Sequence, residues 1–335
     1  MLTARSGAPW SARNPGRRAR TMAPFIVNRV VQTIPILFLG TVIAFMVLRI
    51  IPGDPALVIA GEEATAEDLY AIRDQLGLHD SWPEQYIRWL GDLVQGDFGY
   101  SFHTGLSVSR LFSINFPSTL ELGIAAYIVA ILLGIPLGIL GGVKPRSVWD
   151  WMLSGYTMVA VGVPSFVSGI ILLWIFAAEL SWFPSLGRVS FLDDPVDSLH
   201  HLALPVVALA LPISAVIARY TRTTITDVIS QDFVRTARAK GLGESTVIVR
   251  HALRNSLIPV ITIMALQVGE LLTGVVIIEA VFTRPGLGRV VVEAIQRLDY
   301  LVVQSVLVLL VVVFVTANLL ADIIYGFVDP RVRVR

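Results

Sequence analysis

Cysteine is absent from this chain of 335 residues, which excludes disulfides, thiolate metal sites and a cysteine nucleophile. Lysine is nearly absent too: the chain holds Lys144 and Lys240, which follow Val143 and Ala239. A Walker A loop requires a glycine directly before its lysine, because that lysine reaches the nucleotide phosphates. The HExxH, GxSxG and paired-carboxylate motifs are also missing. The sequence therefore predicts no catalytic residue, no bound cofactor and no metal site in this chain.

Charged residues make up only 15% of the sequence and hydrophobic residues 55%, with a mean hydropathy of +0.72, which excludes an ordinary soluble globule. A transmembrane helix needs about 20 mainly apolar residues. Six stretches are long enough: residues 25–50, 119–142, 150–178, 202–219, 257–281 and 301–325. The prolines inside these stretches predict kinks or packing points: Pro35, Pro136, Pro164 and Pro212. We expect an all-α membrane protein with six transmembrane helices.

The distribution of lysine and arginine predicts the orientation. If the N-terminus is cytoplasmic, the segments on that side carry 18 of the 26 basic residues and the opposite segments carry 8. Basic residues favour the cytoplasmic side, so both termini are expected there. Residues 1–24 contain arginine, glycine and proline without an apolar face, which predicts a disordered cytoplasmic leader and not a signal peptide. Met22 is an equally good candidate for the natural start.

The first extracytoplasmic connection, residues 51–115, is too long for a plain loop. Residues 65–68 resemble a helix capping box, and Leu69 and Ile72 follow at helical spacing before Gly77. A second helix is predicted between Ser81 and Gly96. These signals indicate a small helical subdomain outside the membrane.

Residues 227–259 form a polar stretch between two apolar runs and must lie outside the bilayer. Val228, Ile229, Phe233 and Ala237 share one helical face and predict a short helix. Gly241 is expected to end it, because glycine readily adopts the left-handed conformation of a helix terminus.

A second short helix is predicted to begin at Ser245, and Pro259 is expected to open the fifth span. Its face would carry Ile248, Ala252 and Asn255. Two short helices joined by glycine form a shape that fits a groove in a partner. The alternative is a solvated basic loop that only obeys the charge rule.

The strings FVRTARAKGLGE at 233–244 and HALRNSLIPV at 251–260 resemble the cytoplasmic loop of ABC-importer permeases. The 17 residues between Gly241 and Pro259 resemble the dipeptide/oligopeptide/nickel branch, although Gly243 stands where a serine is expected. GDFGYS at 96–101 and EAVFTRPGLG at 279–288 also resemble this branch. With further matches near both ends, the resemblance covers residues 24–331.

This resemblance implies a permease subunit with three kinds of protein partner: a second homologous permease, two ABC ATPases that hold ATP and magnesium, and an extracytoplasmic substrate-binding protein. It implies a prokaryotic cytoplasmic membrane and no nucleic acid. The cargo would be a dipeptide or oligopeptide, or else nickel or another small solute. The subdomain at 51–115 would be part of the surface that faces the binding protein. The predicted ATPase-coupling residues are Asp232, Phe233, Val234, Arg235, Thr236, Ala237, Arg238, Ala239, Lys240, Gly241, Leu242, Gly243, Glu244, His251, Arg254 and Asn255.

Ionisable groups in a membrane usually face a bundle interior or an aqueous cavity. Gln267, Glu270 and Glu279 are therefore candidates for the translocation pathway, whereas Glu121 and Asp322 lie near span ends and are expected to be structural. His200 and His201 are adjacent on a helix and point to different sides, so shared metal ligation is disfavoured.

Two other functions are compatible with a six-span bundle. A secondary transporter driven by an ion gradient would use Glu270 or Glu279 as its coupling acid. A membrane scaffold would transport nothing. Neither explains the amphipathic loop at 227–259, and a strict requirement for ATP would exclude the secondary transporter.

Overall fold

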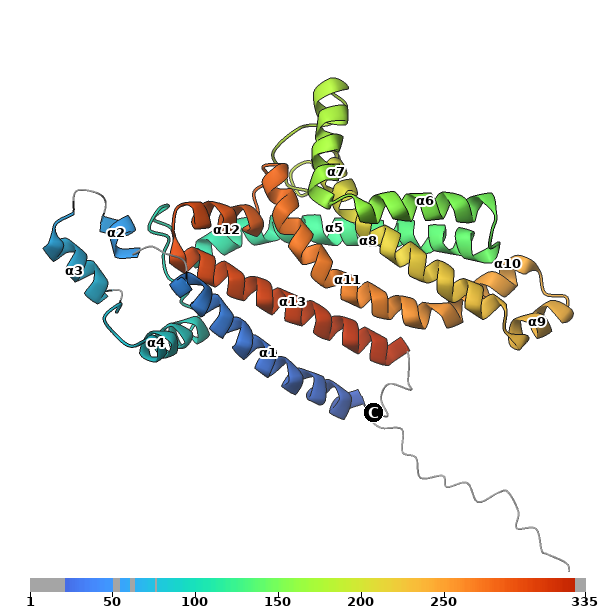
Figure 1. Ribbon diagram of the computed structural model, residues 1–335, viewed down its shortest axis with the longest axis horizontal. Helices are drawn as coiled ribbons and strands as arrows, with labels where there is room; N and C mark the ends of the chain where they lie inside the picture. The colour runs from blue at the N-terminus through green and yellow to red at the C-terminus, as the bar shows by residue number, and fades with distance from the viewer. Residues whose placement is uncertain (1–21, 51–54, 61–63, 76, 329–335) are drawn as a thin grey trace, which may run out of the picture.

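The structure is a computed structural model that describes residues 22–50, 55–60, 64–75 and 77–328. Most of the predicted leader and the segments 51–54 and 329–335 lie outside the described residues. Within them, every regular element is a helix, and the one β-type pairing is an isolated bridge between Tyr100 and Ser107. The helices form an elongated bundle (Figure 1). The predicted all-α membrane fold is confirmed.

Among the described residues, five helices are long and apolar enough to cross a membrane. They are α1 (Met22–Ile50), α5 (Val108–Val143), α8 (Pro195–Ile229), α11 (Arg254–Val281) and α13 (Tyr300–Val328). Their prolines do not interrupt them, as bundled membrane helices allow.

The predicted third span is broken. Helix α6 (Val148–Gly162) and the pair α7 (Ser165–Leu172) and η1 (Leu173–Glu179) meet at an angle of 99°, and they provide a sixth span only if the bent pair counts as one. Pro164 is the cause, because a proline pushes the preceding residue out of the helical region. Val163 accordingly has extended backbone angles, φ −100° and ψ 119°. The kink predicted at Pro164 is therefore present, and it is sharp enough to divide the predicted span into two helices.

The bundle has two distinct ends (Figure 1). Helices α2 (Pro55–Ala60), α3 (Ala66–Gln75), α4 (Trp82–Val94) and α12 (Leu287–Gln296) lie at one end. Helices α9 (Asp232–Ala239) and α10 (Glu244–Thr246), the start of α1 and the end of α13 lie at the other. The helices of 51–115 and those of 227–259, which are predicted to lie on opposite sides of the membrane, thus lie at opposite ends of the bundle.

Helices α5 and α8 approach closely through the glycine ladder Gly134, Gly138 and Gly142. A Cβ on Gly138 would stand 2.6 Å from the carbonyl oxygen of Ala218 and 2.5 Å from Cβ of Thr221. Added Cβ atoms on the other two would also lie 2.8 Å from backbone oxygens of α8. The ladder thus brings the two backbones together, as small residues do between membrane helices. The larger hydrophobic core lies around this contact and reaches α11.

The insertion contains the two helices that its sequence predicts. At the start of α3, the backbone nitrogen of Thr65 donates to Asp68 Oδ2 (3.0 Å), and that of Asp68 donates to Thr65 Oγ1 (3.2 Å). The Thr65 hydroxyl also donates to Asp68 Oδ2 (2.6 Å), and this bond, with the one from the Thr65 backbone nitrogen, lowers the pKa of Asp68. At the start of α4, the backbone nitrogen of Ser81 donates to Glu84 Oε2 (3.0 Å).

The helices of the predicted polar stretch have different bounds. Val228 and Ile229 end α8, so the first short helix begins later, at Asp232. The second is not separate: residues 244–281 form one helix that runs from α10 through the π-helical turns of η2 (Val247–Leu253) into α11. Its N-cap is Gly243 and not Ser245, and Pro259 lies inside α11 and does not open it.

Candidate functional site

Small apolar side chains attach the α9–η2 segment, residues 232–253, to the membrane helices. Val234 and Ala237 of α9 are buried against Val247 of η2, and Val228 of α8 packs on this cluster. Val228 and Ala237 therefore have the packing role that their sequence spacing predicts. Phe233 does not, since it is 40% exposed. The face of α9 that carries Phe233 is thus available to another molecule.

Gly241 turns the chain between α9 and α10. Its φ is +76°, and no atom lies within 4 Å of the place of an added Cβ. The predicted left-handed conformation is therefore present, and backbone geometry alone requires glycine here. Across the turn, Arg238 Nε and Nη2 donate to Glu244 at 3.1 and 2.5 Å. This bond lowers the pKa of Glu244 and raises the pKa of Arg238.

The other predicted coupling residues lie on the outside of this turn or beyond it. Leu242 is 40% exposed, like Phe233. Arg254 and Asn255 begin α11, about 15 Å along the helix from Glu244. The side chain of His251 lies outside the described part of the chain. The exposed members of the predicted set are Asp232, Phe233, Arg235, Thr236, Arg238, Ala239, Lys240, Gly241, Leu242, Gly243, Glu244, Arg254 and Asn255.

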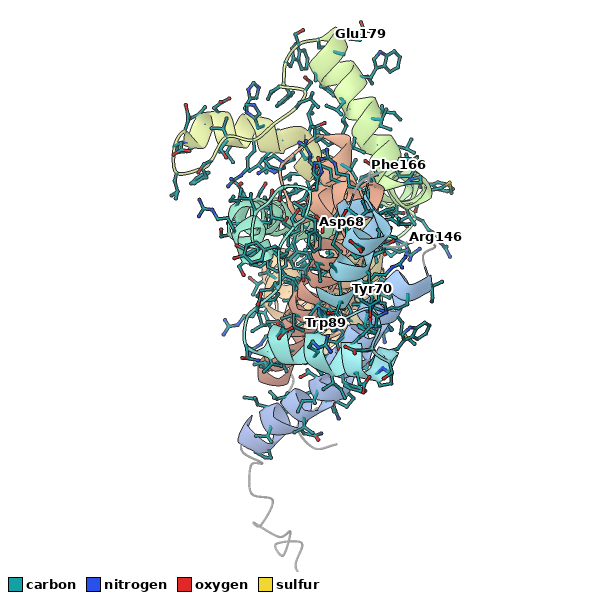
Figure 2. The ribbon with its side chains drawn as sticks, turned by 90° about the vertical axis from the view of Figure 1, so that its left-hand side faces the viewer. Asp68, Tyr70, Trp89, Arg146, Phe166 and Glu179 are labelled. Atoms are coloured by element: carbon teal, nitrogen blue, oxygen red, sulfur yellow. The ribbon has the colours of Figure 1, made fainter. Side chains whose placement is uncertain are left out.

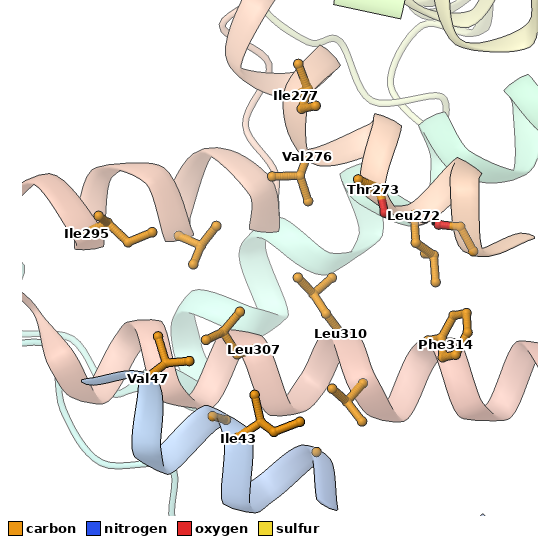
Figure 3. A pocket seen from close by; sticks show the side chains of 15 residues that line it. Ile43, Val47, Leu272, Thr273, Val276, Ile277, Ile295, Leu307, Leu310 and Phe314 are labelled. Carbon is orange, nitrogen blue, oxygen red and sulfur yellow. Dashed lines mark hydrogen bonds between the residues drawn. The ribbon is translucent and has the colours of Figure 1, made fainter. Parts of the chain in front are cut away.

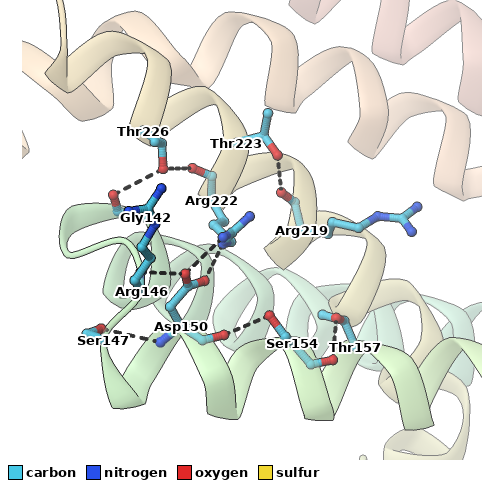
Figure 4. A network of polar contacts seen from close by, with 10 residues as sticks. All are labelled: Gly142, Arg146, Ser147, Asp150, Ser154, Thr157, Arg219, Arg222, Thr223 and Thr226. Atoms are coloured by element: carbon cyan, nitrogen blue, oxygen red, sulfur yellow. Dashed lines mark hydrogen bonds and ion pairs between the residues drawn. The ribbon is translucent and has the colours of Figure 1, made fainter.

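An ion pair that sequence reasoning missed lies next to this segment (Figure 4). Both Nε and Nη2 of Arg222 on α8 bind the buried carboxylate of Asp150 on α6, with Nη2 2.9 Å from Oδ2. The backbone nitrogen of Arg146, in the turn between α5 and α6, also donates to Asp150 Oδ2 (2.9 Å). Thr226 of α8 donates to the carbonyl of Gly142 (3.2 Å). These contacts join the α5–α6 turn to the last turns of α8, which lead into α9. The sequence signal that could have indicated this ion pair is the position of Asp150, a carboxylate at the edge of an apolar run.

A second polar network lies at the opposite end of the bundle. Glu121 Oε2 accepts from Arg284 Nη2 (2.7 Å) and from Arg188 Nε (2.9 Å), while Ser198 donates to Oε1 (3.2 Å). The network joins α5, the connection before α8, α8 itself and the turn after α11. The Arg284 side chain is fully buried. Glu121 thus reaches a neighbouring helix, as expected, whereas its two arginines were not identified from the sequence.

Glu279, a pathway candidate, is fully buried in this conformation. It accepts from Thr119 Oγ1 (2.7 Å) and from the backbone nitrogen of Gly288 (2.7 Å). A Cβ on Gly286 would stand 2.1 Å from its carboxyl group. These contacts hold α5 and the start of α12 around one carboxyl group. A pathway role for Glu279 stays a prediction.

The other two candidates lie on α11. Glu270 is exposed at the surface of this chain, and Gln267, one turn earlier, is partly exposed. Next to them, Gly269 and Leu272 line an apolar cavity of about 650 Å³ between α1, α11, α12 and α13 (Figure 3). The structure does not bring Gln267 and Glu270 near Glu279, because Glu279 lies about 13 Å further along the helix than Glu270.

The histidine pair makes local contacts. His200 Nε2 lies 2.7 Å from the carbonyl oxygen of Trp182, and His201 Nδ1 lies 2.9 Å from that of Asp197. In the part of the chain that the structure describes, no group of three His, Asp or Glu side chains could hold a metal ion.

The fold and these sites define a helical integral membrane protein. It is a helical bundle whose polar helical turn projects at one end and whose helical insertion lies at the other (Figure 1).

Comparison with known proteins defines the family. Residues 134–334 match the family "Binding-protein-dependent transport system inner membrane component", and residues 22–123 match its N-terminal counterpart. The oligopeptide transport system permease protein AppB of Bacillus subtilis is 39% identical over 315 residues, with 93% of this chain and 99% of that protein covered. The glutathione transport system permease protein GsiC of Escherichia coli K12 is 38% identical, with 94% and 100% covered.

A solved structure of the MetNI methionine ABC transporter, in an inward-facing conformation, shares the fold. Its TM-score is 0.55 at 18% identity, with 66% of this chain and 97% of that chain covered.

The chain belongs to the binding-protein-dependent transport system inner membrane component family. It is therefore a translocation subunit of an ATP-driven importer, in which ATP is hydrolysed by other subunits. This membership decides against the ion-gradient carrier and the scaffold that the sequence left open.

Proposed function

We propose that the α9–η2 segment is the surface through which an ATPase subunit drives this permease. The exposed Phe233 and Leu242 beside the buried Val234 and Ala237 carry this proposal. One face of the turn packs on the membrane helices. The other face exposes apolar side chains, whose contact with water is unfavourable unless a partner covers them. Around them stand Arg235 and Lys240, which could pair with carboxylates of a partner.

Motion of this turn would reach the membrane by two routes. Residues 244–281 are one continuous helix, so a displacement of α10 moves α11 directly. Through Arg222 and Asp150, the end of α8 is tied to α6 and to the α5–α6 turn. We propose that these two routes rock the spans between inward-facing and outward-facing states.

We propose that the bundle end that carries α9 lies in the cytoplasm. Both termini of the chain would lie on the same side. The excess of lysine and arginine at that end supports this orientation. The remaining partners would be a second, homologous permease, two ATPases and an extracytoplasmic binding protein at the end that carries α3. The membrane would be the cytoplasmic membrane of a prokaryote.

The proposed cargo is a short peptide. The relatives named above are permeases for oligopeptide and glutathione transport, and a further one, from Sinorhizobium fredii, is named a probable peptide ABC transporter permease. Gln267 and Glu270 are the proposed cargo contacts, because a polar and an ionisable group on an otherwise apolar span need a cavity or a partner beside them.

The test uses the assembled transporter in lipid vesicles. Phe233→Ala should weaken binding of the ATPase subunits and abolish the stimulation of ATP hydrolysis by loaded binding protein. Phe166→Ala is the matched control: Phe166 is 42% exposed, but it lies on α7, within the bent pair. Full ATPase binding and full stimulation in the Phe233 variant would reject the coupling role.

A further inference from the structure

The surface of helix α4 is divided into three edges: one that contacts α1, one that is polar, and one that is apolar and exposed. Gln85, Tyr86 and Trp89 face α1. The polar residues Glu84, Arg88 and Asp92 form a second edge. A third edge is apolar and exposed: Ile87 is 68% exposed and Val94 80%. At 3.6 residues per turn, these two side chains lie within about 20° of each other and about 120° from the polar edge.

The contacts with α1 place α4 at membrane depth. The apolar span of α1 covers residues 24–47. Thr41 Oγ1 lies 2.9 Å from the hydroxyl of Tyr86, and the ring of Phe38 lies 6.3 Å from the Tyr86 ring. Thr41 is six residues before the end of the apolar span, about 9 Å along the helix. Tyr86 thus lies beside the span and not beyond it.

The order of these contacts shows which edge of α4 points inward. Gln85 binds Arg49, at the outer end of α1. Trp89 packs on Phe45, and Tyr86 reaches Thr41 and Phe38, deeper in the span. Passing round α4 from Gln85 through Trp89 to Tyr86 therefore moves down α1 toward the membrane centre.

Continued in the same direction, the circumference of α4 next presents Leu90 and then the exposed edge with Ile87 and Val94. In the opposite direction, beyond Gln85, come Asp92 and Arg88. The apolar edge thus points toward the membrane centre and the polar edge toward water. Arg88 forms an ion pair there with Asp80.

The direction of the helix agrees with this placing. Helix α4, which carries Trp89, is drawn lengthwise in the view along the bundle (Figure 2) and is foreshortened in Figure 1. It therefore crosses the long axis of the bundle, as a helix in the membrane plane would. Helix α1 also exposes Leu39 and Met46 within its apolar span.

We infer that α4 is a membrane-interface helix whose Ile87–Val94 edge is embedded in the acyl chains of the adjacent lipid leaflet. An amphipathic helix with Trp and Tyr at its boundary is suited to this position. The insertion is then divided: α4 lies on the lipid, and α3 remains in water. That this leaflet is the outer one rests on the orientation given under the proposed function. The contact with lipid does not depend on that orientation.

Spin labels on single cysteines test the inference in the assembled transporter, because this chain has no native cysteine. The transporter is placed in vesicles of phosphatidylethanolamine and phosphatidylglycerol. Collision with oxygen, which concentrates in lipid, is compared with collision with a water-soluble nickel chelate. Labels at Ile87 and Val94 should collide more often with oxygen than with the chelate, as should a reference label at Leu39 on α1, which is 57% exposed. Labels at Asp92 and Gln95, on the polar edge of the same helix, should favour nickel.

Two results would overturn the inference. Nickel access at Ile87 and Val94 equal to that at Asp92 would mean that water surrounds α4. Shielding of both sites from both reagents would mean that a protein covers the edge. If the Leu39 label itself collided more often with the nickel chelate, the membrane-spanning permease would be in question and not only α4.

Discussion

The guanidinium of Arg222 binds the carboxylate of Asp150 across 72 positions of sequence, with Nη2 2.9 Å from Oδ2. The bond joins α8, just before it leads into the proposed coupling surface, to the first turn of α6. Asp150 also caps the backbone at Arg146, which has a φ of +62°. One carboxylate therefore holds together two connections at the same end of the bundle.

Loss of this charge should loosen the end of α8. We expect Asp150→Asn to lower the thermal stability of the purified transporter and to reduce transport per ATP hydrolysed, because hydrogen bonds to a charged group contribute about 1.5–3 kcal/mol. Uptake and ATP hydrolysis measured on the same vesicles give this ratio. Asp227→Asn, at an exposed carboxylate on α8, is the control. Equal ratios in the two variants would limit Asp150 to a local structural role.

Gly138 should tolerate no side chain. Gly138→Ala places a methyl group 2.6 Å from the carbonyl of Ala218, so α5 and α8 must separate. Overpacking of this kind costs about 1–3 kcal/mol. We expect a lower melting temperature and less assembled transporter. Gly155→Ala on α6, where no atom lies within 4 Å of the added Cβ, should be neutral. Similar melting of the two variants would contradict the close helix approach.

Glycine should be required at position 241 because of its backbone conformation and not because of crowding around it. A residue other than glycine costs about 1–2 kcal/mol in the left-handed conformation, which is too little to unfold the bundle but enough to redirect α9. We expect Gly241→Val to insert and to pair with the partner permease, yet to lose cargo-stimulated ATP hydrolysis. Gly241→Asn should retain part of the stimulation, because asparagine tolerates this conformation.

Gly243→Ala is the control for this series. Gly243 has an ordinary φ of −62°, and no atom lies within 4 Å of its added Cβ. Wild-type stimulation in Gly241→Val would show that the turn does not couple the ATPase to the membrane.

The two glutamates of α11 should behave differently. We expect Glu270→Gln to change the apparent affinity or rate of cargo uptake while the assembled transporter keeps its stability, since Glu270 is exposed on this chain. Glu279→Gln should instead lower stability, because the buried carboxyl group accepts from Thr119 and Gly288. Uptake kinetics and thermal melting of both variants separate these effects. Unchanged uptake in Glu270→Gln would remove it from the pathway.

The two ends of the bundle should react from opposite sides of the membrane. Single cysteines at Glu67 on α3 and at Ser245 on α10 are both exposed. In intact cells, an impermeant maleimide should label Glu67→Cys and should label Ser245→Cys only after the cells are opened. Labelling of Ser245→Cys in intact cells would reverse the proposed orientation.

The sequence by itself determined the number and place of the apolar runs, the glycine turn at Gly241 and the two helices of the insertion. Each of these depends on neighbours within a few residues: an apolar run long enough to span a bilayer, a left-handed glycine, a capping residue before a helix. The four-residue spacing of Gly134, Gly138 and Gly142 can also be read from the sequence, but the helix that they approach cannot.

Only the tertiary structure decided which distant side chains meet. The pairing of Asp150 with Arg222, and of Glu121 with Arg188 and Arg284, joins residues 67 to 163 positions apart. The periodicity of a sequence reports only on residues a few positions apart, so it cannot distinguish these arginines from ordinary basic residues. The sequence does not predict the continuous helix from Glu244 into α11, because a proline at the edge of an apolar run is typical of a helix start, whereas packing in a bundle keeps Pro259 inside the helix. The depth of α4 was also hidden, because its three edges acquire a direction only from the side chains of α1 that they touch.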